Sequence, residues 1–129
     1  MKFKYTIPYV ADVAKTLAFY GSAFGFKTRF LHDGGDYGEL ETGSTTLSFC
    51  SLGLMKQLGK SPAQATIKAP SFEIAFETDT VADDLATALA AGAKLVQEVR
   101  QEPWGQTTAY VSDLNGFLIE ICSPVKPQP

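Results

Sequence analysis

In the first half of the chain, the spacing of apolar residues changes between the alternation typical of strands and the three- and four-residue spacing typical of a helix. Alternation of β-branched and aromatic residues with polar ones predicts strands, and apolar residues spaced three and four apart predict a helix. Asp12 is a suitable N-cap for that helix, and Gly25 is a suitable residue to end it. The expected elements are strands at residues 3–10, 27–31, 36–41 and 44–51 and a helix from Asp12 to about Phe24.

The same order of patterns returns after Pro70. The last two strands of this half flank a turn-forming segment, in which we expect Asn115 and Gly116 to take the positive φ angles of a tight hairpin turn. The expected elements are strands at residues 71–78 and 94–100, a helix from Asp79 or Thr80 to about Ala91, and two strands on either side of residues 113–116.

The two halves are also related residue by residue. Thr42-Gly43 corresponds to Asn115-Gly116, and residues 47–51 (LSFCS) correspond to residues 119–123 (IEICS). Such a repeat predicts two βαβββ modules, each with one sheet face that its own helix leaves uncovered. We therefore expect an α+β fold in which the modules close into a curved, cup-like mixed sheet with the helices outside. The expected division is a first module at 1–52, a linker at 53–70 with a helical piece near Met55–Leu58, a second module at 71–124 and a tail at 125–129, forming one structural domain overall.

Composition narrows the class of protein. The net charge of −3 and the pI near 5.0 argue against nucleic acid as a partner, because phosphate binding requires a basic surface. No apolar run approaches the roughly 20 residues that cross a bilayer, so we expect a cytoplasmic protein without membrane contact. Cys50 and Cys122 lack the spacing of a metal site and are expected to be buried thiols.

One carboxylate stands out in the last predicted strand. Glu120 interrupts an otherwise apolar run from Phe117 to Cys122. A charge at such a position is costly unless something pairs with it. Its place in the strand therefore indicates a site more clearly than it indicates a reaction.

The chain resembles the vicinal oxygen chelate superfamily, which includes glyoxalase I, extradiol dioxygenases, fosfomycin-resistance enzymes and bleomycin-resistance proteins. The resemblance covers nearly the whole chain outside the linker. For the fold it is specific, but it does not select one activity, because the superfamily hosts several reactions and also non-catalytic binders. The segments that carry it are residues 10–26 (VADVAKTLAFYGSAFGF), 72–79 (FEIAFETD), 104–105 (WG) and 113–120 (DLNGFLIE).

The resemblance implies where a metal would be bound, on the first and last strands of each module. The family's enzymes usually carry His or Gln, Glu, His and Glu at these positions. Here the positions fall on Tyr5, Ser48, Glu73 and Glu120, so only the last one matches. Hydroxyl groups are poor ligands for a divalent transition metal, although two carboxylates could hold Mg²⁺ or Mn²⁺ with water. We therefore expect no metal cofactor, with Mg²⁺ or Mn²⁺ at Glu73 and Glu120 as the alternative.

A cup without a metal leaves three uses for Glu73 and Glu120. Two carboxylates in a partly dry site cannot both ionise cheaply, so they share a proton or attract a cation. They can therefore bind a small cationic ligand, or act as catalytic residues on an acidic C–H or O–H group. In the third case Glu120 is satisfied by the Tyr5 and Ser48 hydroxyls and only stabilises an empty cup.

Aromatic residues on or beside the strands favour ligand binding. We expect Tyr37, Tyr110 and Trp104 to contact the ligand, together with Tyr5 and Ser48, and we expect Phe49 and Phe72 to be core residues. The segment from Trp104 through Gly116 also resembles the bleomycin-resistance branch, which sequesters planar cationic drugs. The resemblance thus implies a homodimer that binds a small aromatic or cationic compound, with antibiotic resistance as one role. The alternative is an enzyme, a lyase or isomerase or a dioxygenase relative.

Overall fold

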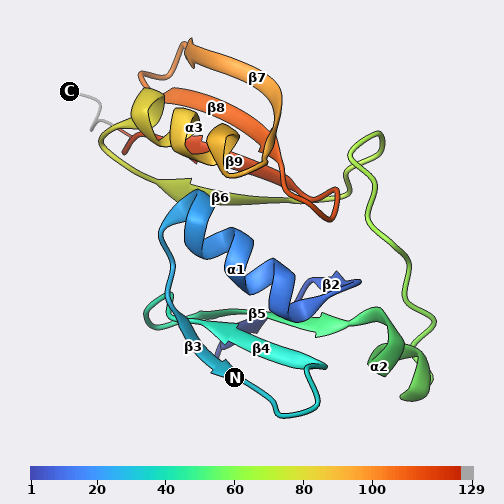
Figure 1. Ribbon diagram of the computed structural model, residues 1–129. Coiled ribbons are helices and arrows are strands. Elements are labelled where there is room, and N and C mark those ends of the chain that lie inside the picture. Colours follow the sequence, from blue (N-terminus) through green and yellow to red (C-terminus); the bar gives the residue numbers. More distant parts are fainter. Residues whose placement is uncertain (126–129) are drawn as a thin grey trace. The chain divides into compact units, whose positions relative to one another are not determined.

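The computed structural model describes residues 1–125, and the chain divides into two compact units, one up to Ala65 and the other from Thr66 onward. Each unit is a mixed open sheet of βαβββ order with its helix against one face (Figure 1). The α+β class and the paired modules predicted from the sequence are confirmed. Of the expected tail, residues 126–129 lie outside the described residues.

The first unit has the sheet order β1-β5-β4-β3, in which β1 runs parallel to β5 and the other neighbours are antiparallel. The single strand expected at residues 3–10 is instead two short strands, both parallel to β5. Pro8 interrupts them because it has no N–H to donate, although its carbonyl still accepts a hydrogen bond from the Cys50 N–H. The elements are β1 (Tyr5–Thr6), β2 (Tyr9–Val10), α1 (Val13–Phe24), β3 (Thr28–Leu31), β4 (Tyr37–Leu40), β5 (Thr46–Ser51) and α2 (Leu52–Gln57).

Helix α1 is terminated as the sequence predicts. The Asp12 carboxylate accepts the Lys15 N–H at 3.0 Å, and Gly25 ends the helix in the left-handed conformation at φ 79°. The buried face of the helix packs on β4 and β5, where the Tyr20 and Phe49 rings lie 4.9 Å apart. Because side chains alternate along a strand, Ser48 must point to the opposite face. We call this helix-free side of each sheet its open face.

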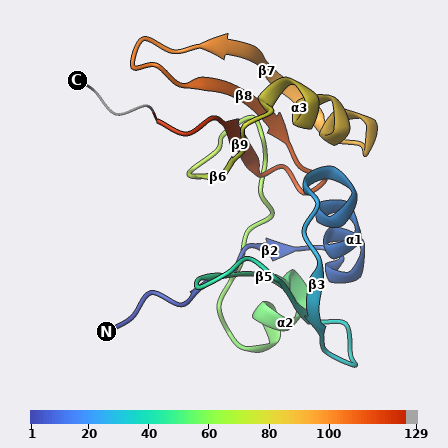
Figure 2. The same cartoon turned by 90° about the vertical axis from the view of Figure 1, so that its left-hand side faces the viewer.

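The second unit has the order β6-β9-β8-β7, with β6 parallel to β9 and the other pairs antiparallel. Helix α3 packs against β7, β8 and β9 on one face (Figure 2). The expected helix start is confirmed at Thr80, although the Thr80 side chain makes no capping hydrogen bond. The elements are β6 (Glu73–Glu77), α3 (Val81–Ala90), β7 (Lys94–Gln101), β8 (Thr107–Ser112) and β9 (Leu118–Cys122).

The turn between β8 and β9 differs from the expected one. Gly116 has a positive φ of 93°, but Asn115 does not. The buried Asp113 carboxylate accepts the backbone N–H groups of Asn115 and Phe117, both at 2.8 Å, and so holds a longer turn closed. This turn fixes Tyr110 of β8 opposite Glu120 of β9.

The repeat is visible in the strand registers. Tyr5 pairs with Thr46, which is two residues before Ser48. Glu73 pairs with Leu118, which is two residues before Glu120. Across the next strand, Ser48 pairs with Glu39 and Glu120 pairs with Tyr110. The pairs Tyr5 and Glu73, Ser48 and Glu120, and Glu39 and Tyr110 therefore occupy equivalent positions. Each unit also carries a register shift at the same place, between Thr28 and Phe30 in β3 and between Leu95 and Gln97 in β7.

The segment expected to link the modules contains one short helix. It is α2, which starts directly after β5 and earlier than the helical piece expected near Met55–Leu58. The Ser51 hydroxyl caps it by accepting the Leu54 N–H at 3.0 Å. None of the helices in residues 1–125 combines the length and apolar character needed to cross a membrane.

The contact between α1 and β4 yields a stability prediction. A Cβ atom added at Gly38 would lie 2.6 Å from Leu17 Cδ1 and 3.1 Å from Val13 Cγ1, so Gly38→Ala should lower the free energy of unfolding by about 1–3 kcal/mol. Gly34→Ala is the matched control, since its new Cβ would have no neighbour closer than 3.7 Å. Urea denaturation followed by circular dichroism measures both. Equal stability of the two variants would contradict this account of the packing.

Candidate functional site

Two glutamates and a tyrosine meet on the open face of the second unit. Glu73 on β6 and Glu120 on β9 both lie within hydrogen-bond distance of the Tyr110 hydroxyl on β8. The Tyr110 Oη atom is 2.9 Å from Glu120 Oε2 and 3.2 Å from Glu73 Oε2. Ile119 and Ile121, which flank Glu120, are buried on the other face. We call these three residues the carboxylate cluster.

The carboxylate cluster has two acceptors for one hydroxyl proton. A phenol has a single hydrogen to donate, so the Tyr110 O–H cannot satisfy both carboxylates at once. Within the described part of this unit, no Lys, Arg or His side chain forms an ion pair with Glu73 or Glu120, and the ion pair present there joins Arg100 to Glu102. The negative charge of the cluster is therefore not compensated by the unit itself.

The cluster changes the acidity of its neighbours. Burial raises the pKa of Tyr110, and the hydrogen bond and charge of Glu120 add to this effect, followed by those of Glu73. Burial also raises the pKa of the Cys122 thiol, with further contributions from Glu120, Glu77 and Glu73. Tyr110 thus stays protonated at neutral pH and serves as a donor to the carboxylates. Both cysteines are free, buried thiols, as expected from the sequence.

The open face of the first unit carries a different polar cluster. Arg29 Nε donates to Glu39 Oε1 at 3.2 Å, and Arg29 Nη2 donates to the Thr46 hydroxyl at 2.7 Å. The Tyr37 hydroxyl donates to Glu39 Oε2 at 2.8 Å. We call Arg29, Tyr37, Glu39 and Thr46 the arginine cluster. Here the carboxylate is compensated by a guanidinium from its own unit, and Arg29 is an exposed residue of β3.

Ser48 and Tyr5 lie on strands beside the arginine cluster. Ser48 is fully buried, and its Oγ atom has no hydrogen-bond partner of normal geometry in residues 1–125. The hydroxyl is nevertheless close enough to Tyr37 to oppose the rise in the pKa of Tyr37 that burial and Glu39 cause. Tyr5 is 47% exposed. Within the second unit, the Tyr110 hydroxyl donates a hydrogen bond to Glu120.

Trp104 and Phe72 are both about half-exposed. Trp104 is 50% exposed in the loop between β7 and β8, where its Nε1–H donates to Gln106 Oε1 at 2.8 Å. The loop begins beyond the paired residues Gln101 and Thr107. Thr107 is three residues from Tyr110 along β8, a distance of about 10 Å in a strand. Phe72 is 46% exposed and touches Phe117, so the buried position expected for it is wrong. The buried position expected for Phe49 is confirmed.

Glu39 was not singled out from the sequence, although the sequence contains the signal. Alternation along residues 36–41 places Tyr37 and Glu39 on one face, and the hairpin pairing brings that face beside Ser48. Arg29 reaches this face because the register shift in β3 sets two residues, Arg29 and Phe30, opposite Glu39.

The positions that the family resemblance assigns to a metal do not fit a transition metal. Tyr5 and Ser48 offer only hydroxyls, and Glu73 and Glu120 are bridged by the Tyr110 hydroxyl. No group of three or more His, Cys, Asp and Glu side chains in residues 1–125 is arranged to hold a metal ion. A hard cation at Glu73 and Glu120 would need most of its ligands from water. His32 lies exposed in the turn after β3, with its Nδ1 accepting the Gly34 N–H.

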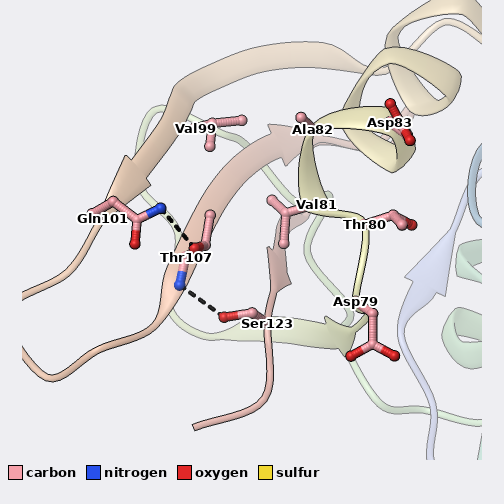
Figure 3. A pocket seen from close by; sticks show the side chains of 9 residues that line it. All are labelled: Asp79, Thr80, Val81, Ala82, Asp83, Val99, Gln101, Thr107 and Ser123. Carbon is pink, nitrogen blue, oxygen red and sulfur yellow. Dashed lines mark hydrogen bonds between the residues drawn. The ribbon is translucent and has the colours of Figure 1, made fainter. Parts of the chain in front are cut away.

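A separate hollow of about 350 Å³ lies on the helix side of the second unit. It is bounded by Thr80, by the first turn of α3, which includes Val81, and by the ends of β7 and β8 (Figure 3). Its polar wall is engaged in the fold, because Gln101 Nε2 donates to Thr107 Oγ1 and the Thr107 N–H donates to Ser123 Oγ. We therefore take the carboxylate cluster on the open face as the candidate site.

Comparison with known proteins identifies the family. The family model described as a glyoxalase-like domain matches residues 3–126. A glyoxalase-related enzyme from Fulvimarina pelagi superposes with a TM-score of 0.83 at 20% identity, covering 96% of this chain and 88% of that one. A glyoxalase/bleomycin resistance protein/dioxygenase family enzyme from Burkholderia phytofirmans PsJN gives 0.83 at 21% identity, covering 98% and 100%.

A third similar structure is TioX from Micromonospora sp. ML1, with a TM-score of 0.72 at 20% identity over 95% of this chain and 98% of that one. At these identities the structural matches establish the fold alone. A search of the curated proteins gave no significant match. The ligand or reaction must therefore be argued from the residues of this chain.

The shared proton of Tyr110 leads to a prediction about pH. Because the folded state holds this proton more tightly than the unfolded state, the contribution of Tyr110 to stability is complete below about pH 10 and is lost as the pH rises further. In an alkaline absorbance titration of the 5 tyrosines, Tyr110→Phe should remove one late-titrating residue. Glu120→Gln should instead move that residue towards the ordinary range. Removal of an early-titrating tyrosine by Tyr110→Phe would refute the cluster geometry.

Proposed function

The chain belongs to the glyoxalase-like domain family, and on that premise we propose that it binds a small organic cation at Glu73 and Glu120 without a transition metal. The observation that carries the proposal is the single Tyr110 proton between two carboxylates. Glu73 is exposed and Glu120 is half-buried, and two neighbouring carboxylates without a cation partner in their unit attract a cation. The cation would donate to the carboxylate oxygens that Tyr110 leaves free.

The surroundings of the cluster support an organic cation over a simple ion. Tyr110 supplies an aromatic ring beside the carboxylates, and aromatic rings attract organic cations through their π faces. Trp104, half-exposed in the loop after β7, can cover a larger aromatic ligand. We include Tyr5, Ser48 and Tyr37 in the proposal as ligand-contacting residues on the open face of the first unit. The buried Ser48 hydroxyl supports this, because it lacks a partner of normal geometry in the described chain.

In biological terms the proposal is a binding protein for a small aromatic or cationic compound, with drug sequestration and antibiotic resistance as one such role. We propose that it acts as a cytoplasmic homodimer. These statements extend the resemblance to bleomycin-resistance proteins seen in the sequence.

A second candidate function is acid–base catalysis at the same residues, of a lyase or isomerase type. It is favoured by the same hydrogen-bonded chain, because Glu73, Tyr110 and Glu120 form a path along which a proton can move. The carboxylate that lacks the Tyr110 hydrogen bond would take a proton from an acidic C–H group of the substrate. The single Tyr110 O–H would then turn from the carboxylate to the developing oxyanion and stabilise it by donating to it.

Binding of benzylammonium chloride tests the first function. By isothermal titration calorimetry, Glu120→Gln and Glu73→Gln should each weaken binding about tenfold or more, because each removes a charged acceptor. Glu98→Gln on β7 is the matched control and should bind as the natural protein does. Similar affinities for all four proteins would contradict the proposal.

A separate experiment tests whether the protein binds a metal ion. In a thermal-shift series with Mg²⁺, Mn²⁺, Ni²⁺ and Zn²⁺, we expect no ion to raise the melting temperature by several degrees, since specific binding stabilises the folded state by mass action. A large shift with Ni²⁺ or Zn²⁺ that disappears in Glu120→Gln would overturn the metal-free part of the proposal.

Proton exchange tests the second function. If the carboxylate cluster is catalytic, NMR in D₂O should detect exchange of C–H protons next to the carbonyl group in small 2-oxo compounds such as pyruvate, and Glu120→Gln should abolish it. If the cluster only binds a cation, the exchange rate should equal that of the buffer. Catalysed exchange that survives in both Glu73→Gln and Glu120→Gln would place any catalysis elsewhere.

A further inference from the structure

A proline-rich tail follows the last strand of the second unit. After Ser123 the sequence reads Pro-Val-Lys-Pro-Gln-Pro, and the last four of these residues lie outside the described part of the chain. We infer that this tail docks on the Trp104 side chain of the same chain, with Lys126 and Pro127 against the indole ring. The inference goes beyond the proposed function and does not depend on it.

The tail starts beside the loop that carries Trp104. Ser123 still follows the register of β8 and β9, because its N–H donates to the Thr107 carbonyl at 2.9 Å and its hydroxyl accepts the Thr107 N–H at 2.8 Å. In this antiparallel register, each further residue of an extended tail would lie opposite a residue one step earlier in the loop. Such a tail would reach the level of Trp104 at residue 126.

One glutamine side chain connects Trp104 to the start of the tail. Gln106 Oε1 accepts the indole Nε1–H of Trp104 at 2.8 Å, and Gln106 Nε2 donates to the Ser123 carbonyl at 2.9 Å. These two hydrogen bonds turn the indole towards the side of the loop on which β9 ends. The loop is also closed at its base, because the Glu102 N–H donates to the Gln106 carbonyl at 2.8 Å. Trp104 is therefore held in place by the loop although it is 50% exposed.

The sequence of the tail suits an aromatic surface. Prolines at positions 124, 127 and 129 favour the polyproline II conformation, which is extended and docks on aromatic side chains at a low cost in entropy. A lysine ammonium over an indole face adds a cation–π attraction, which is strongest for tryptophan. At about 3.1 Å per residue in polyproline II, the six residues after Ser123 span about 19 Å. The tail is therefore long enough to cross the indole.

The place where the tail starts favours the chain's own tail over other occupants of the ring. The short tether from Ser123 gives the tail an effective concentration in the millimolar range at Trp104. A separate proline-rich peptide, or the tail of a second copy, would have to bind without this advantage. A contact of a few residues is too small to pay the full cost of association between separate molecules.

Fluorescence tests the contact directly, because the sequence contains a single tryptophan. The experiment compares the full chain with a chain that ends at Val125. The shortened chain should emit at longer wavelength and be quenched more strongly by acrylamide, because water reaches the ring face that the tail leaves. Lys126→Gln combined with Pro127→Ala should shift the emission in the same direction. Lys94→Gln, at the far end of β7, is the matched control and should leave the emission unchanged.

Proton NMR detects the same contact from the side of the tail. The ring current of Trp104 should move the Lys126 Hε and Pro127 Hδ resonances upfield in the full chain. Trp104→Leu should return these resonances to the positions that they have in the free peptide SPVKPQP, and Trp104→Phe should retain part of the shift. Tail resonances at free-peptide positions in the natural protein would refute the docking, as would equal emission and quenching of the full and shortened chains.

The remaining outcomes identify which tail occupies the ring. Emission that is independent of protein concentration, and that is partly restored when the peptide SPVKPQP is added to the shortened chain at millimolar concentration, would support docking within one chain. A shift that grows with protein concentration would assign the contact to the tail of a second copy and overturn the inference. A shift on adding an unrelated proline-rich peptide to the full chain, with none on shortening it, would assign the ring to a separate partner and overturn it as well.

Discussion

The interaction on which the rest of the account depends is one hydroxyl proton between two carboxylates. Tyr110 is the described donor to Glu73 and Glu120 within their unit, and the raised pKa of Tyr110 keeps its proton in place. Among the described residues of its unit this acidic pair has no cation partner, and it lies on a sheet face whose opposite side is packed with Ile119 and Ile121. The proposed affinity for a cation, or for a proton from a substrate, rests on this imbalance.

The two units of the duplicated fold treat the charge of a glutamate on the open face differently. Both units place a tyrosine hydroxyl against a glutamate on the open face of the sheet, Tyr37 on Glu39 in one and Tyr110 on Glu120 in the other. In the first unit Arg29 forms an ion pair with Glu39, and the arginine cluster therefore stabilises the fold. In the second unit the balance is incomplete. We regard this difference between the two units as a reason to propose a function for the second unit.

Much of the fold could be read from the sequence, because periodicity, caps and the repeat all agree. The carboxylate cluster was harder to predict, because the pairing register of β8 and β9 decides whether Tyr110 faces Glu120. A two-residue turn with Asn115 and Gly116 at its centre would have set Tyr110 opposite Ile121, on the wrong face. The buried Asp113 carboxylate closes a longer turn, and Tyr110 therefore faces Glu120. In the first unit a register shift in β3 sets both Arg29 and Phe30 opposite Glu39, which the sequence pattern does not reveal.

The most direct test of the account is a crystal structure of the protein with benzylammonium bound. The account predicts the ammonium nitrogen within hydrogen-bond distance of the Glu73 and Glu120 carboxylates, with Tyr110 still donating to Glu120. It would be contradicted by a Lys or Arg side chain paired with Glu73 and Glu120. It would also be contradicted by a cation that binds in the hollow beside α3 and leaves the carboxylate cluster untouched.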